Sequence, residues 1–267
     1  MNKAVTKKKV WKLCRVGTAG FFEDVVLKEK IVALIVDGRE EVSVVLTPGE
    51  EDLWALGHLF SRRMILSRND IVFLEIGANR ISIQRKVKRK GLSIRHRFVD
   101  TASSCLTEAV KENPKTKDKR LPLEVRWHVP YALVEKAVQN LSAAPLFRQT
   151  GSVHVAILAD TKGRTLCCVE DVGRHNAVDK AVGWAVKNGV KTMDCFLAVS
   201  GRLPADMVCK AFGAQIPFVA SISAATASGI EAAERFGITL VGFVREGRMN
   251  VYSVPERFAE LGSVNGR

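Results

Sequence analysis

Apolar positions in the first hundred residues mostly form short runs, rich in β-branched side chains and bounded by turn residues such as Asp37-Gly38 and Ala78-Asn79. Such runs are typical of strands. The stretch 50–64 differs, because its apolar residues recur at helical spacing after Thr47-Pro48, a start signal for a helix. This half is therefore predicted to be α+β. Its strands are expected at 32–36, 42–46, 71–76 and 81–87.

From about residue 128, helical and strand patterns alternate along the chain. This alternation is typical of a largely parallel sheet covered by helices. The sequence thus predicts an α+β domain over 1–127, with a polar loop at about 100–120, and an α/β domain over 128–267. In the second domain we expect helices near 133–141, 177–187, 205–214 and 227–236, and strands at 153–158, 165–169, 196–199, 218–222 and 238–243.

Composition excludes several classes of protein. With 47% hydrophobic residues among 267, the chain can bury sizeable cores, unlike a disordered or collagen-like chain. Six cysteines are too few for a disulfide-built scaffold of this length. No apolar run approaches the ~20 residues of a membrane span, and the basic N-terminus lacks the apolar segment of a secretory signal. A cytoplasmic protein with no membrane partner is predicted.

Positive charge is concentrated in the first half of the chain. Residues 1–150 hold 28 Lys and Arg against 17 Asp and Glu, residues 151–267 hold 13 against 11, and the formal net charge is +13. The densest basic stretch, 80–97, fits either the solvated face of a strand or a nucleic-acid contact. The chain offers few aromatic side chains to stack on bases, with only two Tyr, so no nucleic-acid partner is expected.

Four segments follow the expected strands of the second domain, at 170–176, 200–202, 223–226 and 243–248. Ligands of open α/β sheets bind beyond the carboxyl ends of the strands, and three of these segments supply arginines, which suit phosphate. Any single one of these residues is equally compatible with a purely structural role. Asn176, paired with Asp179, would also serve as a helix cap, and so would Thr226. The candidate ligand contacts are Arg174, His175, Arg202, Thr226, Arg245 and Arg248.

Sequence patterns for known nucleotide and metal sites are missing. Neither G-x-G-x-x-G nor G-x-x-x-x-G-K-[ST] occurs, which argues against a dinucleotide-binding Rossmann unit and a P-loop. The five histidines are scattered and none is paired at helical spacing with His or Cys. No structural metal is therefore predicted, and His175 is the one histidine expected in a ligand-facing loop.

Cys105 is the candidate nucleophile. It lies in the polar loop and is followed by five basic residues, a setting that favours the reactive thiolate over the thiol. Isolated cysteines are more often buried small apolar residues. We expect that role for the other five, which fall in predicted strands or a helix: Cys14, Cys167, Cys168, Cys195 and Cys209.

Residues 170–180, which read EDVGRHNAVDK, resemble the signature of the formate dehydrogenase accessory sulfurtransferase family, FdhD/NarQ. The resemblance is dense from 150 to 258 and fainter before that, at Thr47-Pro48 and 56–60. It implies a sulfur carrier that takes sulfur as a persulfide from a cysteine desulfurase. The carrier passes the sulfur to the bis(molybdopterin guanine dinucleotide) molybdenum cofactor before that cofactor enters the formate dehydrogenase catalytic subunit.

The resemblance also implies a fold and a binding segment. The C-terminal domain is expected to be a cytidine-deaminase-like α/β sandwich without zinc, and a guanine nucleotide is expected to fit the cofactor site. The sequence argues against a zinc deaminase, because neither H-x-E nor P-C-x-x-C is present at the corresponding places. A homodimer is compatible with the family. The family's cofactor contacts match Phe243, Val244, Arg245, Glu246, Gly247 and Arg248.

The cysteine loop departs from the family pattern. Ser103-Ser104-Cys105 falls on the first half of Ser-Ser-Cys-Gly-x-Cys-Gly, but Glu108 stands in place of the second cysteine and both glycines are lost. One thiol suffices to carry a sulfane sulfur. Cys105 is therefore the predicted persulfide carrier. The alternative is a cofactor- or guanine-nucleotide-binding chaperone that has lost sulfur transfer.

Overall fold

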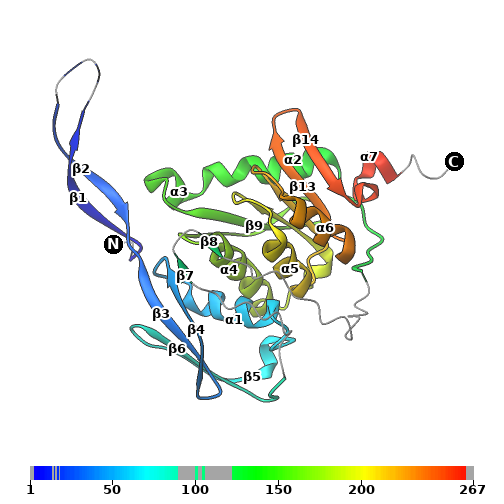
Figure 1. Ribbon diagram of the computed structural model, residues 1–267, viewed down its shortest axis with the longest axis horizontal. Helices are drawn as coiled ribbons and strands as arrows, with labels where there is room; N and C mark the ends of the chain where they lie inside the picture. The colour runs from blue at the N-terminus through cyan, green and yellow to red at the C-terminus, as the bar shows by residue number, and fades with distance from the viewer. Residues whose placement is uncertain are drawn as a thin grey trace.

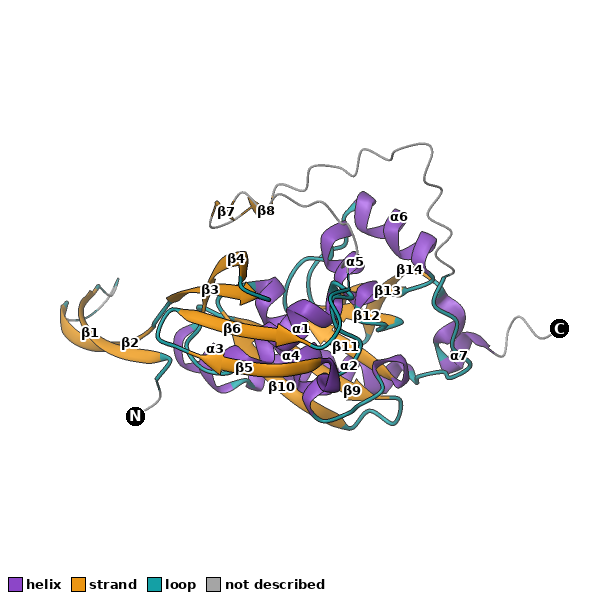
Figure 2. Cartoon of the chain, turned by 90° about the horizontal axis from the view of Figure 1, so that it is seen from below, coloured by secondary structure: helices purple, strands orange, loops and turns teal. Residues whose placement is uncertain are grey.

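The computed structural model of the protein describes residues 3–13, 15, 17, 19–89, 100–101, 104–105 and 122–262. Over these residues the chain is a mixed α/β structure with several sheets (Figure 1). It begins with an arm, the antiparallel hairpin of β1 (Val5–Lys12) and β2 (Gly20–Leu27). The arm projects from the body at the end opposite the C-terminus, as Figure 2 also shows. The predicted strands did not include it, because three consecutive lysines interrupt the alternation of β1.

A four-stranded sheet with the order β4-β3-β6-β5 follows the arm. Alternate residues such as Val32, Leu34 and Ile81 turn to one face of this sheet, where they pack against Trp54 and Leu56 of a single helix. The strands and the helix predicted for this half are confirmed to within a few residues at their ends. They are β3 (Lys30–Val36), β4 (Arg39–Leu46), α1 (Glu51–Ser61), β5 (Ile71–Ile76) and β6 (Arg80–Arg85).

A six-stranded sheet with the order β10-β9-β11-β12-β13-β14 forms the centre of the second half. Successive residues of its strands alternate between two buried faces: Leu197 lies in one apolar cluster and Ala198 in the other. The strands are β9 (His154–Asp160), β10 (Thr165–Asp171), β11 (Cys195–Val199), β12 (Phe218–Ser221), β13 (Thr239–Arg245) and β14 (Arg248–Ser253).

Helices cover both faces of this sheet. On one face lie α4 (Arg174–Lys187), α5 (Ala205–Gly213) and α6 (Ala227–Phe236). On the other lie α2 (Tyr131–Gln139) and the short α3 (Pro145–Thr150), while α7 (Ala259–Gly262) ends the described chain. Leu123, which precedes the expected domain boundary at 127/128, packs in the core of this second half. The boundary itself stays a prediction.

Two expectations for the second half were wrong. Only β11, β12 and β13 run parallel, because tight turns with Gly163 and Gly247 at positive φ join β9 to β10 and β13 to β14 as antiparallel hairpins. The segment 243–248 is therefore a hairpin and not a strand-to-helix loop. In addition, α4 begins at Arg174 and not at 177, so Asn176 lies inside the helix and does not cap it.

The two halves of the chain meet where α1 packs against α4. Gly57 and Gly183 let the two backbones approach: a Cβ on Gly57 would lie 1.8 Å from the Asp179 carbonyl oxygen, and a Cβ on Gly183 equally close to that of Leu53. Close approach of this kind needs residues without a side chain. The contact fixes the N-terminal sheet against the C-terminal half of the chain.

Candidate cofactor-binding site

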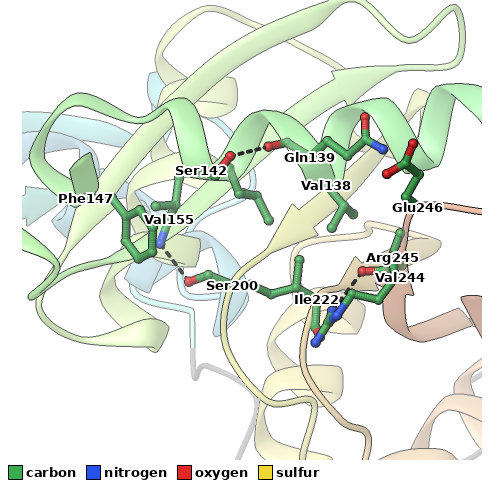
Figure 3. A pocket seen from close by; sticks show the side chains of 11 residues that line it. Val138, Gln139, Ser142, Phe147, Val155, Ser200, Ile222, Val244, Arg245 and Glu246 are labelled. Atoms are coloured by element: carbon green, nitrogen blue, oxygen red, sulfur yellow. Dashed lines mark hydrogen bonds between the residues drawn. The ribbon is translucent and has the colours of Figure 1, made fainter.

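A cavity of about 540 Å³ opens between α2, α3 and the carboxyl ends of β11, β12 and β13. Its walls are mainly apolar, with a few polar side chains at the rim, which is typical of small-molecule sites. Figure 3 shows Phe147 and Val155 on one side and Arg245 and Glu246 on the opposite side. The lining residues are Val138, Gln139, Leu141, Ser142, Phe147, Val155, Ser200, Ile222, Val244, Arg245 and Glu246.

The hairpin 243–248 forms one wall of the cavity. Arg245 Nη1 donates to the carbonyl oxygens of Ile222 and Val244, at 2.6 and 2.9 Å. The Gly247 backbone N–H donates to Glu135 of α2 at 2.7 Å, which ties the hairpin tip to the opposite wall. Of the six predicted contacts in this segment, Val244, Arg245 and Glu246 line the cavity, whereas Phe243, Gly247 and Arg248 are exposed outside it.

Two further predicted contacts, Arg174 and His175, lie at the start of α4, next to the loop that follows β11. His175 Nε2 lies 2.9 Å from the carboxylate of Asp206 in α5. Burial tends to raise the pKa of Asp206, but the hydrogen bond and charge of His175 outweigh it, and the pKa is lowered. The pair fixes the His175 ring between two helices.

The other two predicted contacts have different surroundings. Arg202 is exposed on the loop after β11. Thr226 is the N-cap of α6, where its hydroxyl accepts from the Gly229 N–H at 3.2 Å. Thr226 therefore has the helix-capping role that the sequence left open for it. The loops 200–204 and 223–226 lie side by side through a parallel bridge between Leu203 and Ala225.

Much of the run 170–180 is buried at the junction of the two halves. The Asp171 carboxylate accepts from the backbone N–H groups of Thr47 and Gly173, and Lys180 lies 2.9 Å from it. Asn176 accepts from the Trp54 indole at 3.2 Å and donates to the Val45 carbonyl. These polar residues hold the N-terminal sheet in place.

A second buried cluster surrounds Asp179 on the same helix. Lys210 Nζ lies 2.7 Å from both carboxylate oxygens, His58 Nδ1 lies 3.5 Å from one of them, and the Ser61 hydroxyl donates to the other at 3.3 Å. Burial lowers the pKa of His58, although the Asp179 carboxylate opposes that shift. His58 is therefore neutral in the folded protein near pH 7.

Acidification should destabilise the protein through His58. The unfolded chain protonates this imidazole near pH 6.5 while the folded chain resists, so stability falls by up to about 1.4 kcal/mol for each pH unit below that value. Urea unfolding at pH 7 and pH 5 measures this loss. His58→Gln should reduce the difference between the two pH values, and an unchanged difference would contradict the role of His58.

Basic residues of the stretch 80–97 also differ from the sequence expectation. Arg85 is nearly buried, with its guanidinium 2.7 Å from Asp37, and it also donates to the Met64 carbonyl. Arg89 pairs with Asp70 at 3.5 Å. The expectation that alternation leaves the basic side chains of this strand facing outward was wrong for Arg85. Residues 90–97 lie outside the described residues.

Cys105 is described only by its backbone, in the short strand β8 (Ser104–Cys105), which pairs with β7 (Asp100–Thr101). Cys14, Ser103 and Glu108 lie outside the described residues.

Cys168 is exposed on β10, so its expected burial was wrong, and Cys209 is only half-buried. Partial desolvation by the surrounding protein, with the nearby charge of Glu170, raises the pKa of Cys168 to about 11, and burial raises those of Cys167 and Cys195 to about 12. These three thiols are poor nucleophiles at neutral pH.

The residues of α2 and α3 that line the cavity, such as Val138 and Phe147, were not predicted as site residues. Their apolar periodicity is that of any core-facing helix, so the sequence carries no signal for them.

Across the described residues, no group of three or more His, Cys, Asp or Glu side chains is arranged to hold a metal ion. In the same part of the chain, no helix has the length and apolar character to cross a membrane.

Comparison with known proteins identifies the family. The sequence model of the FdhD/NarQ family matches residues 27–259. Proteins named sulfur carrier protein FdhD include one from Thermoplasma acidophilum, 34% identical over 95% of this chain and 94% of the relative, and one from Anaeromyxobacter dehalogenans, 32% identical over 91% of each. A crystal structure of a Desulfotalea psychrophila protein, described as a formate dehydrogenase accessory protein, superposes with a TM-score of 0.74 at 26% identity, covering 96% of this chain and 99% of that one. This chain therefore belongs to the FdhD/NarQ family.

Proposed function

We propose that this protein carries sulfur as a persulfide on Cys105 from a cysteine desulfurase to the bis(molybdopterin guanine dinucleotide) molybdenum cofactor, before the cofactor enters formate dehydrogenase. Support comes from the relatives named sulfur carrier proteins and from the structural neighbour described as a formate dehydrogenase accessory protein. We also infer a cytidine-deaminase-like sandwich without zinc for residues 128–267. The two helical layers on the six-stranded sheet support that inference.

The cavity is the observation that carries the cofactor part of the proposal. Its volume of about 540 Å³ suits one nucleotide and not a whole bis-dinucleotide, so we assign it to one guanine nucleotide end. Apolar walls such as Val138 and Ile222 would contact the base, and the Glu246 carboxylate at the rim is an acceptor suited to the N–H groups of guanine. The rest of the cofactor would extend toward the loops at the sheet edge.

Sulfur transfer requires a single thiolate. The Cys105 thiolate would attack the terminal sulfur of the donor's cysteine persulfide, forming a new S–S bond while the donor's S–S bond breaks and its cysteine leaves as a thiolate. No net oxidation occurs, since the sulfane sulfur only changes its carrier. The high pKa values of Cys167, Cys168 and Cys195 favour Cys105 for this step.

Incubation with a cysteine desulfurase and cysteine should add one sulfur atom to the protein, detected by intact-mass spectrometry and located on the Cys105 peptide. Cys105→Ala should abolish the adduct, whereas Cys168→Ala, the change at an exposed thiol with a raised pKa, should retain it. An adduct that survives Cys105→Ala would end the persulfide proposal.

The second candidate function is a cofactor- or guanine-nucleotide-binding chaperone without sulfur transfer. Glu108, in place of the family's second loop cysteine, is the observation that favours it. Nucleotide binding by a chain that forms no persulfide would support this alternative.

A further inference from the structure

A group of basic side chains lies at the end of the cavity that contains Ser200. His154 is the first residue of β9, Arg174 is the first residue of α4, and Ser200 follows β11. The Ser200 hydroxyl accepts from the Val155 N–H at 3.0 Å and lies 3.3 Å from His154 Nδ1. Because β9 runs antiparallel to β11, the start of β9 lies at the carboxyl end of β11. The three residues are thus neighbours.

Arg174 is held at this place by its surroundings. Its side chain lies against Gly201, where a Cβ would come within 3.0 Å of the Arg174 Cβ and 3.3 Å of its Cδ. The Arg174 Nε is buried and has no hydrogen-bond partner in the described structure. A buried donor without an acceptor is costly, and an anionic ligand is one way to satisfy it.

Charges around His154 are mostly positive. Burial lowers the pKa of His154, and the charges of Arg174 and His175 lower it further. Two carboxylates lie near this group: Asp171 lies 2.9 Å from the Lys180 ammonium, and Asp206 lies 2.9 Å from His175 and also interacts with the charge of Arg174. The arrangement therefore favours an added anion.

This basic group is continuous with the cavity, since Ser200 and Val155 belong to the cavity lining (Figure 3). At the other side of the cavity, Arg245 Nη1 already donates to two backbone carbonyls. For a nucleotide whose base lies among the apolar walls, Arg174 and His154 offer anion-binding groups at the Ser200 end of the cavity.

We propose that Arg174 and His154 form the subsite for the phosphate groups of the guanine nucleotide, and that His154 takes up a proton when these groups bind. The inference rests on the proposed nucleotide cavity. Arg174 contributes charge and the Nε–H donor, and protonated His154 contributes a second cation and donor. Binding of the phosphates then becomes stronger as the pH falls, because the bound anion stabilises the imidazolium.

Calorimetric titration of the full chain with GDP and with guanosine tests the subsite. Arg174→Gln should weaken GDP binding about tenfold or more while leaving guanosine binding unchanged, because a hydrogen bond to a charged group contributes about 1.5–3 kcal/mol. Thermal unfolding of the variant checks that it folds. Equal affinities of the wild type for GDP and guanosine, or an Arg174→Gln variant with unaltered GDP binding, would overturn the subsite.

Proton uptake is measured by titrating GDP at pH 6.5 and pH 8 in two buffers with different ionisation enthalpies. The wild type should bind GDP more tightly at pH 6.5 and take up a proton. The His154→Gln variant keeps a hydrogen-bonding group near Ser200 and should take up fewer protons than the wild type when GDP binds. Because the phosphate of GDP itself titrates with a pKa near 6, this variant also measures how much of the proton uptake comes from the phosphate. Equal uptake by the two proteins would remove His154 from the proposal. A wild type that binds neither GDP nor guanosine would instead overturn the nucleotide cavity.

Discussion

Replacing Lys180 with methionine is expected to lower the free energy of unfolding by about 3–5 kcal/mol. The Lys180 and Asp171 side chains are essentially inaccessible to solvent, and the ammonium lies 2.9 Å from the carboxylate. Methionine fills a similar volume but carries no charge, so the Asp171 carboxylate would stay buried without its cation. Because Asp171 also accepts from the Thr47 backbone, the loss should loosen the junction between the two halves. Urea unfolding followed by tryptophan fluorescence measures the change.

Lys187→Met is the matched control. Lys187 lies two turns further along α4 and pairs with Asp52 of α1 at 2.8 Å, but its side chain is 54% exposed. An exposed pair contributes about 1 kcal/mol or less, so this variant should unfold close to the wild type. Similar losses of unfolding free energy for the two variants would show that the contribution of the Lys180–Asp171 pair to stability does not depend on its burial.

Helices and strands with strong local signals could be predicted from the sequence. The helix α6 was expected at 227–236 and is found there, because Thr226 caps it and Gly237 ends it at positive φ. The arm, α3 and β14 were not predicted. In β14 the apolar residues Met249 and Val251 give too short an alternation, and α3 is too short for a helical period to appear.

Candidate site residues could be predicted where they lie at or just beyond the carboxyl end of a strand, as Arg245 at the end of β13 and Arg174 after β10 illustrate. His154 escaped prediction for a geometric reason. It begins an antiparallel strand, and an argument from the carboxyl ends of strands does not consider the amino ends that antiparallel pairing brings to the same edge. Buried ions were missed for another reason, since nothing in the spacing of Asp171 and Lys180 separates a buried pair from a solvated one.

Gly57→Ala is expected to destabilise the protein by at least about 3 kcal/mol, the upper end of the range for overpacked cores. The new methyl group would lie 1.8 Å from the Asp179 carbonyl oxygen and 2.7 Å from the Gly183 backbone nitrogen, so α1 and α4 would have to separate. Helix propensity predicts the opposite sign, because alanine favours an isolated helix over glycine by about 1 kcal/mol. The direction of the change therefore distinguishes the two effects.

Gly20→Ala controls for the chemistry of the substitution. Gly20 lies in β2, and a Cβ there would meet only the Phe22 ring, at an ordinary contact distance of 3.6 Å. This variant should be neutral or slightly stabilising, since alanine reduces the freedom of the unfolded chain. Thermal and urea unfolding of both variants measure the difference. If Gly57→Ala matched Gly20→Ala in stability, α1 and α4 would not pack with their backbones in contact, and the junction that carries Asp171, Asn176 and Asp179 would need a different arrangement.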